Sequence, residues 1–171
     1  MPNFSQIVNE EQSNKIISYF PYAKRNFKIS LLYSAQKDGW TVKEFKERVF
    51  DKGSTLIILK TSKGAICGGY TSKDWNGSGS YTNDLDAFVF NMNTKFIPIN
   101  YDQAILTYSD GFSFGDDVLT LKGEPLNKQN AGTCYKGKNK GYDIEGDVSP
   151  LTNEEFCFTC EELEVYKVVY D

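Results

Sequence analysis

The sequence contains no histidine. This absence excludes the Ser-His-Asp triad, the Cys-His pair, histidine-ligated metal sites and pH switches based on an imidazole. A basic excess is missing as well, because 19 Lys and Arg residues face 23 Asp and Glu residues and give a net charge of −4. A domain-wide electrostatic footprint for nucleic acid is therefore absent, and we expect no nucleic-acid partner.

Long hydrophobic runs are also absent. No stretch approaches the roughly 20 apolar residues that a membrane helix needs, so we expect no transmembrane segment. The opening Met1-Pro2-Asn3 is followed by polar and acidic residues rather than by the apolar region of a secretory signal. These features predict a cytoplasmic protein in which the four cysteines are reduced thiols.

The composition that remains is that of a globular domain. The chain has 171 residues, of which 40% are hydrophobic, and its aromatic residues are 12 Phe, 11 Tyr and 2 Trp. Such a chain can build a core without covalent staples. At about one domain per 150 residues, we expect one domain spanning residues 1–171, with a helical lead-in at 5–20 and a core at 28–170.

Two helices are predicted in the first third of the chain. Apolar residues at helical spacing favour a helix over 5–20, with Asn9 as a cap for the acidic pair that follows it. Thr41 and Glu44 form a capping-box pattern before a second amphipathic helix. Gly53 is expected to supply the left-handed end of this second helix.

Strands dominate the rest of the chain. The continuous apolar run at 55–60 predicts a buried strand, which forms a hairpin with 65–70. Alternation over 161–170 predicts a closing strand, whereas 71–84 has the composition of a long surface loop. Further short strands are expected at 28–34, 87–91, 95–98, 104–108 and 118–121. Helices first and many strands after them predict a β-rich α+β fold, an antiparallel two-sheet β-sandwich flanked by helices.

Seven strings occur in the order found in a known family. The string Gly68-Gly69-Tyr70-Thr71-Ser72-Lys73-Asp74-Trp75 resembles the central motif of the TLDc domain, the domain of the oxidation-resistance proteins. The other strings are at 31–34, 38–40, 52–56, 84–90, 113–119 and 158–168. The residues that carry the motifs are Asp38, Gly39, Gly53, Gly68, Gly69, Tyr70, Trp75, Phe114, Gly115, Glu162 and Glu164. The stretch 122–150 departs from the family pattern, and there only Gly141-Tyr142 matches.

The resemblance implies both a fold and a role. TLDc domains are sandwiches of two antiparallel sheets with helices at the side. They are linked to oxidative-stress resistance and to binding of the vacuolar proton-pumping ATPase, whose assembly or activity they modulate. The family brings no accepted catalytic mechanism.

The cysteines offer one metal or redox motif. Cys157 and Cys160 form a C-x-x-C, and Cys67 and Cys134 bring the number of thiols to four. A structural zinc site normally uses two close ligand pairs, and here only one exists. The acidic residues after Cys160 are expected to raise thiol pKa values rather than lower them, which disfavours redox chemistry. We therefore expect packed thiols, no metal and no cofactor.

The carboxylates offer an acid–base motif. Glu162 and Glu164 share one face of the closing strand, with Cα atoms about 7 Å apart. That spacing fits the carboxyl pair of a hydrolase, but it equally fits a solvated outer face, which we expect. Asp116-Asp117 is a second acidic pair, and the acidic residues at 143–147 lack the twelve-residue calcium pattern of an EF-hand.

Exposed aromatic and basic residues are the candidates for partner binding. Trp75 and Tyr81 bracket the Gly- and Ser-rich segment 76–80, where aromatic residues either anchor interfaces or close the ends of a core. A basic tip is either a contact for an acidic partner or a solvated loop; it consists of Lys136, Lys138 and Lys140.

Since no catalytic constellation is convincing, we expect a monomeric, non-catalytic protein-binding module. Its expected partner is the vacuolar proton-pumping ATPase, and its expected role is in oxidative-stress resistance. Two alternatives remain open. One is a structural subunit of another large assembly, for example a cytoskeletal one. The other is an oxidative-stress enzyme that uses the Glu or Cys residues.

Overall fold

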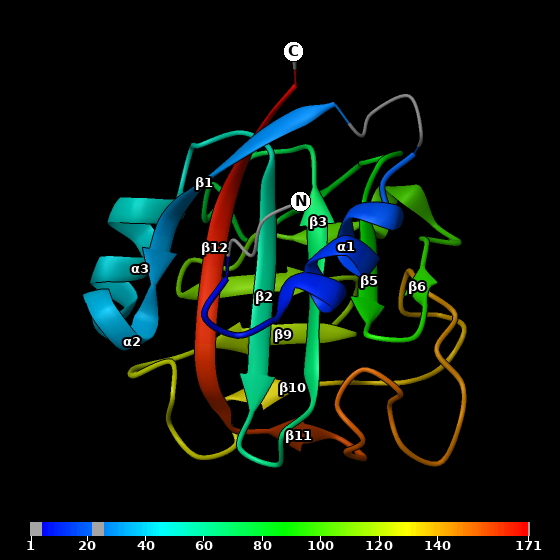
Figure 1. Ribbon diagram of the computed structural model, residues 1–171. Helices are drawn as coiled ribbons and strands as arrows, with labels where there is room; N and C mark the ends of the chain where they lie inside the picture. The colour runs from blue at the N-terminus through cyan, green and yellow to red at the C-terminus, as the bar shows by residue number, and fades with distance from the viewer. Residues whose placement is uncertain (1–4, 22–25, 171) are drawn as a thin grey trace.

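The strands of the chain form two antiparallel sheets that pack face to face (Figure 1). The computed structural model describes residues 5–21 and 26–170. In Figure 1 the strands of the second sheet run behind those of the first at a steep angle. This arrangement confirms the predicted β-sandwich.

The first sheet has the strand order β1-β12-β2-β3-β5-β6, and the second has the order β11-β10-β9-β8-β7-β4. The strands of the first sheet are β1 (Phe27–Ser34), β2 (Thr55–Thr61), β3 (Ile66–Thr71), β5 (Phe88–Asn91), β6 (Lys95–Phe96) and β12 (Cys160–Tyr170). Those of the second are β4 (Tyr81–Thr82), β7 (Ile105–Leu106), β8 (Gly111–Phe114), β9 (Leu119–Lys122), β10 (Gly132–Thr133) and β11 (Cys157–Phe158). A short 3-10 helix, η2, spans Tyr101–Gln103.

Strand β2 lies between β12 and β3 and is buried on both faces. Ile57 and Leu59 belong to the inner core between the two sheets. Leu56 and Ile58 belong to an outer core on the opposite face of the first sheet. A strand with two buried faces needs apolar side chains at every position, which explains the unbroken apolar run in the sequence.

Helix α1 (Glu10–Ser18) covers the outer core. It crosses the outer face of the first sheet in front of β2 and β3 (Figure 1). Ile16 is fully buried there, and the Phe20 ring meets the Phe88 ring edge-on with centroids 5.2 Å apart. The chain needs this helix because a sheet that is apolar on both faces requires a cover on each side.

The helix is shorter than the predicted span of 5–20. Asn9 caps it as expected, and the cap is a reciprocal box: Gln12 N donates to Asn9 Oδ1 at 2.8 Å and Asn9 N donates to Gln12 Oε1 at 3.0 Å. The helix therefore begins after Asn9, and residues 5–8 precede it outside the helix. Among the described residues, every helix is too short or too polar to span a bilayer.

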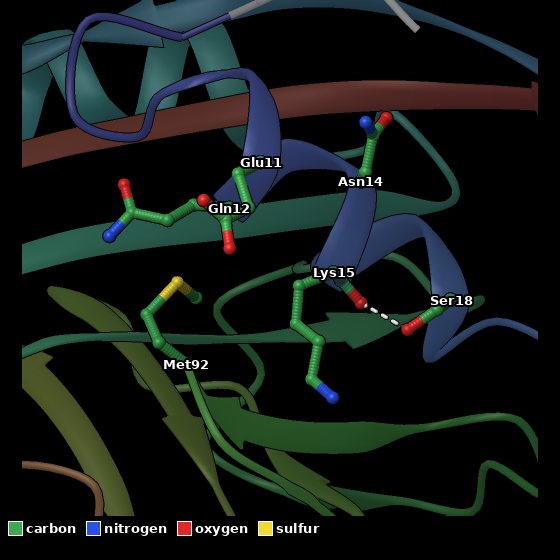
Figure 2. A pocket seen from close by; sticks show the side chains of 6 residues that line it. All are labelled: Glu11, Gln12, Asn14, Lys15, Ser18 and Met92. Atoms are coloured by element: carbon green, nitrogen blue, oxygen red, sulfur yellow. Dashed lines mark hydrogen bonds between the residues drawn. The ribbon is translucent and has the colours of Figure 1, made fainter.

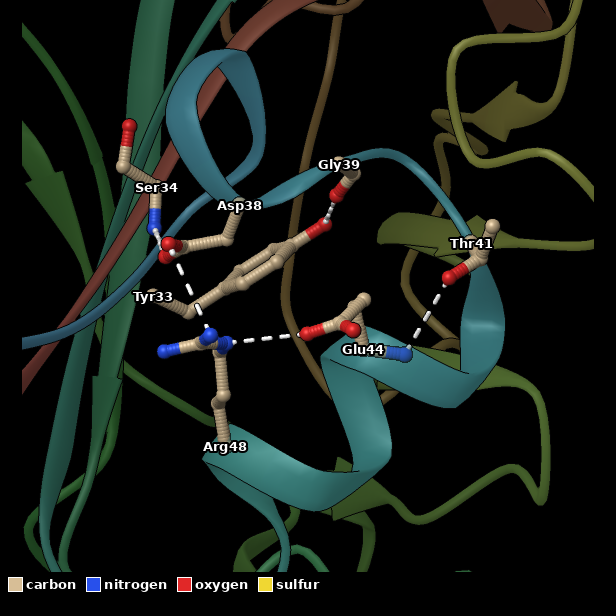
Figure 3. A network of polar contacts seen from close by, with 7 residues as sticks. All are labelled: Tyr33, Ser34, Asp38, Gly39, Thr41, Glu44 and Arg48. Carbon is tan, nitrogen blue, oxygen red and sulfur yellow. Dashed lines mark hydrogen bonds and ion pairs between the residues drawn. The ribbon is translucent and has the colours of Figure 1, made fainter.

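Helices α2 (Ala35–Asp38) and α3 (Val42–Val49) lie beside β1, where polar contacts join them (Figures 1 and 3). The Asp38 carboxylate accepts from Ser34 N at 3.0 Å and lies 3.7 Å from the Arg48 guanidinium. Tyr33 donates its hydroxyl proton to the Gly39 carbonyl at 2.5 Å. These bonds connect the end of β1 to both helices.

The two signals predicted for the ends of α3 are only partly correct. Thr41 Oγ1 accepts from Glu44 N at 3.2 Å, as a cap should, but the Glu44 carboxylate accepts from Arg48 Nε at 3.0 Å. The first left-handed residue after the helix is Asp51 with φ 61°, not Gly53. Gly53 has a φ of 78° further on, and its amide donates to Asp74 Oδ1 at 2.5 Å.

The predicted surface loop at 71–84 is present in part: residues 72–80 lie outside any helix or strand, and most of them are exposed. The segment contains β4 and the fully buried Trp75, and it ends at the buried Asp84. The Asp84 carboxylate accepts from Thr71 Oγ1 at 2.6 Å and from Ser72 N at 2.8 Å. The segment is polar because many of its side chains face solvent, while others bond to the buried Asp84. Strands β4, β8, β10 and β11 were not predicted, whereas the other expected strands are present with somewhat different bounds.

The glycine pair of the central motif permits close packing on both faces of β3. A Cβ on Gly68 would lie 1.9 Å from the Ile57 carbonyl oxygen. A Cβ on Gly69 would lie 2.5 Å from the Phe114 ring of the second sheet. Only glycine fits at these two positions, so the pair permits the close approach of β2 and of the second sheet.

We predict that Leu56→Asp or Ile58→Asp abolishes cooperative folding. Each places an unpaired charge in the outer core beneath α1, at a cost of several kcal/mol. Thermal unfolding followed by circular dichroism checks this, with Leu85→Asp as the control because Leu85 is exposed. A soluble Ile58→Asp variant with an unchanged melting temperature would contradict the placement of β2.

Candidate partner-binding site

Trp75 is a structural residue, which corrects its assignment to a binding surface. Its side chain is 0% exposed, and its indole Nε1 donates to Thr55 Oγ1 at 2.9 Å. The ring meets Phe114 edge-on with centroids 5.4 Å apart. Because the side chain contributes to the inner core and has no exposed surface, a partner cannot reach it without unfolding the domain.

Other family-motif residues also hold the fold together. Asp38 and Gly39 belong to the network that attaches α2 and α3 (Figure 3). Tyr70 accepts from the Tyr170 hydroxyl at 2.7 Å in the outer core. Gly115 has a φ of 66°, and a Cβ there would lie 2.4 Å from the Lys140 carbonyl oxygen. These motif residues therefore stabilise the packing of the sandwich.

Glu162 and Glu164 line one cleft of about 390 Å³, as the alternation on the strand predicted. The expectation that both lie on a solvated face is wrong for Glu164, which is only 1% exposed. Its carboxylate accepts from Gln6 N at 3.0 Å and from the Ser5 hydroxyl. The hydrogen bonds offset the cost of burying the charge, so this carboxylate serves to attach the N-terminal segment to β12.

The pair Asp116-Asp117 is likewise engaged. Asp116 Oδ2 lies 3.3 Å from Lys140 Nζ. Asp117 Oδ1 accepts from the Tyr108 hydroxyl at 2.9 Å and from Thr120 Oγ1 at 3.0 Å. The two carboxylates therefore orient side chains around the turn between β8 and β9.

The cysteines are four free thiols, of which Cys67, Cys134 and Cys160 are buried. Burial raises the pKa of each of these three thiols, so they stay protonated at neutral pH. Protonated, buried thiols are poor nucleophiles and poor metal ligands. Across residues 5–21 and 26–170, no group of three or more Cys, Asp or Glu side chains is arranged to hold a metal ion.

The three lysines of the basic tip do not act as one group. Lys138 is exposed and lies 3.8 Å from Glu145. Lys136 and Lys140 instead line a separate cleft of about 400 Å³, whose other walls are the rings of Tyr135 and Phe156. We call this the lysine–aromatic cleft, defined by Tyr135, Lys136, Lys140 and Phe156.

The lysine–aromatic cleft combines apolar walls with two cations. Lys136 Nζ lies 5.1 Å from the centroid of the Phe156 ring, and Lys140 Nζ lies 5.5 Å from that of Tyr135. Phe156 is 62% exposed, more than the aromatic side chains of Tyr81 at 40% and Tyr101 at 38%. Exposed aromatic residues beside positive charges are typical of sites that bind partners.

Tyr81 is connected to this cleft by the carboxylate of Asp116. Its side chain is 40% exposed and lies near Asp116, which pairs with Lys140. Partial burial, followed by the charge of Asp116, raises the pKa of the Tyr81 hydroxyl, which is therefore neutral at pH 7. The structure thus brings Tyr81 and Lys140 together and leaves Lys138 apart.

Sequence reasoning missed two residues of the site, Tyr135 and Phe156. Both lie in or next to the stretch 122–155, which has no hydrophobic periodicity. Phe156 follows Glu154-Glu155, and an aromatic residue next to charges outside any periodic element is the signal that could have identified it. Its proximity to Lys136 depends on the pairing of β10 with β11.

A third hollow lies along the exposed side of α1 and measures about 490 Å³ (Figure 2). Its lining includes the charged side chains of Glu11 and Lys15 and the apolar side chain of Met92. Gln12 is already used in the helix cap, and the Ser18 hydroxyl donates to the Lys15 carbonyl at 2.5 Å. Since its charges are mixed and its lining has no aromatic ring, the lysine–aromatic cleft is the stronger candidate.

We predict that a chelator leaves the thermal unfolding curve unchanged. Cys160→Ser should lower the free energy of unfolding by about 1–3 kcal/mol, since a hydroxyl replaces a buried thiol, and Cys157→Ser should cost less because Cys157 is partly exposed. Metal analysis and calorimetry check these expectations. One equivalent of zinc, or collapse on chelation, would overturn the assignment of packed thiols.

Comparison with known proteins places the chain in a family. The model of the TLDc domain matches residues 1–169. The MTOR-associated protein MEAK7 of Xenopus laevis is 29% identical over 83 residues, which cover 48% of this chain and 18% of that protein. The chain thus matches only a small part of this curated relative. The family model covers nearly the whole chain, and its motif residues are those that hold the sandwich together: the chain belongs to the TLDc domain family.

Proposed function

We propose that this chain is a non-catalytic module that docks on the vacuolar proton-pumping ATPase and thereby contributes to oxidative-stress resistance. Family membership supports a protein-binding role. The observation that carries the proposal is the lysine–aromatic cleft, an exposed aromatic and cationic surface on a rigid frame. We further propose that the module acts as a cytoplasmic monomer.

The frame beneath the cleft favours binding over catalysis. Cys134 N donates to the Phe156 carbonyl at 2.8 Å, and Tyr135 N donates to the Asp117 carbonyl at 2.8 Å. These backbone bonds hold the two rings on adjacent strand ends before any partner arrives. Preorganised side chains lose little conformational entropy on binding, which increases affinity.

The groups considered for catalysis have other roles. Glu164 and Asp117 accept hydrogen bonds that attach neighbouring segments. The thiols of Cys67 and Cys160 are buried and have raised pKa values. A catalytic carboxylate or thiolate must be free to exchange a proton or attack a substrate, so these side chains favour the non-catalytic proposal.

We predict that the chain binds the purified catalytic complex of the proton pump at micromolar concentration or tighter. The combined variant Tyr81→Ala with Lys140→Gln should weaken binding at least about tenfold, as expected when an aromatic anchor is lost, with little loss of stability. Biolayer interferometry at low and high salt measures the binding of the wild-type chain and of this combined variant. Trp75→Ala is unsuitable, because it removes a core residue.

Leu85→Ala serves as the control, since Leu85 is exposed and is not part of the cleft. No binding by the wild-type chain would overturn the pump as its partner. Equal binding by wild type and the combined variant would be consistent with the pump as partner, but it would exclude this surface as the binding site.

A further inference from the structure

We propose that the lysine–aromatic cleft binds an acidic peptide segment of the partner protein that carries one apolar side chain between its carboxylates. This inference rests on the proposed protein-binding function and adds the chemistry of the partner. The apolar side chain would lie between the Tyr135 and Phe156 rings, and the carboxylates would meet the ammonium groups of Lys136 and Lys140.

The size and walls of the cleft fit one large side chain together with a short stretch of backbone. Its volume of about 400 Å³ is at the small end of ligand sites. Covering the exposed ring of Phe156 removes apolar surface from water, which favours an apolar occupant. A purely polar ligand would not gain the free energy of removing this apolar surface from water.

The positive charge at Lys136 selects an acidic occupant. Its Nζ donates to the Asp147 carbonyl at 3.1 Å and to the Glu155 carbonyl at 2.7 Å. An ammonium group has three N–H donors, and these two acceptors are neutral. The charge is therefore held in place without being neutralised by its contacts, and a carboxylate is the complementary ligand.

Lys140 adds a second, weaker cationic contact. Its ion pair with Asp116 spans 3.3 Å, and both side chains are more than 30% exposed, at 33% and 38%. Pairs this exposed contribute little stability. An incoming carboxylate can therefore share the Lys140 ammonium group at small cost.

The surroundings favour a peptide over an anionic membrane. Glu155 is exposed and directly precedes Phe156 of the cleft, and the chain as a whole carries a net charge of −4. Segments that bind anionic lipids have clusters of about four to eight Lys or Arg residues, whereas two lysines line this cleft. A broad negative surface would be repelled by the flanking acids, while a narrow acidic strand can reach the two lysines.

The test adds each of three capped pentapeptides to the full chain. Binding is monitored by the shifts of amide signals in ¹H–¹⁵N correlation spectra of the chain. The probe is Asp-Glu-Phe-Asp-Glu, and the two controls are Asp-Glu-Gly-Asp-Glu and Asn-Gln-Phe-Asn-Gln. We expect the probe to shift amide signals of residues 135–140 and 154–157. Each control should bind at least about tenfold more weakly, because it lacks either the anchor or the charge.

The chain supplies matched variants. Phe156→Ala and Lys140→Gln should each weaken binding of the probe, and Lys140→Gln should also reduce its salt dependence. Lys138→Gln removes the same charge from the same loop outside the cleft, so it should bind as the wild type does. Unchanged melting temperatures would show that the Phe156 and Lys140 variants remain folded.

Shifts that map away from the cleft, or equal affinity for probe and neutral control, would overturn the proposal. Binding to vesicles containing phosphatidylserine without a response to the probe would overturn it as well. If the chain binds the pump but the probe gives no response, only the cleft assignment fails. If the probe binds at the cleft but the pump does not bind, the acidic-peptide chemistry is supported and only the proposed partner fails.

Discussion

The burial of the first sheet on both faces is the constraint on which the rest of the structure depends. Strand β2 supplies Ile57 and Leu59 to the inner core and Leu56 and Ile58 to the outer core. One cover is the second sheet and the other is helix α1, so neither can be removed without exposing a continuous apolar surface.

Close packing on both faces of the first sheet also explains the glycine pair in β3. The Ile57 carbonyl and the Phe114 ring approach this strand so closely that a Cβ on Gly68 or Gly69 would overlap them. Trp75 fills the adjacent space against Phe114 and donates to Thr55. The family motif is therefore largely a set of packing requirements.

Buried carboxylates fasten the covering segments to the sandwich. Glu164 accepts from the backbone of Gln6, and Asp84 accepts from Thr71 and Ser72. A buried carboxylate is costly unless its oxygens accept hydrogen bonds, so each of these groups favours the one arrangement in which its donors are in place. The free-energy cost of desolvating each carboxylate is thus offset only when the attached chain segment occupies its defined position.

The sequence by itself determined the class of fold and most strands, because period-two patterns, unbroken apolar runs and caps such as Asn9 are local signals. It also ruled out histidine chemistry. Tertiary structure alone decided which polar residues are buried, as at Glu164, and which aromatic residues are exposed, as at Phe156. It also decided that Lys136 and Lys140 share a cleft while Lys138 does not. These outcomes depend on which distant segments pair, as β10 pairs with β11, and pairing across a long separation leaves no periodic trace in a single sequence.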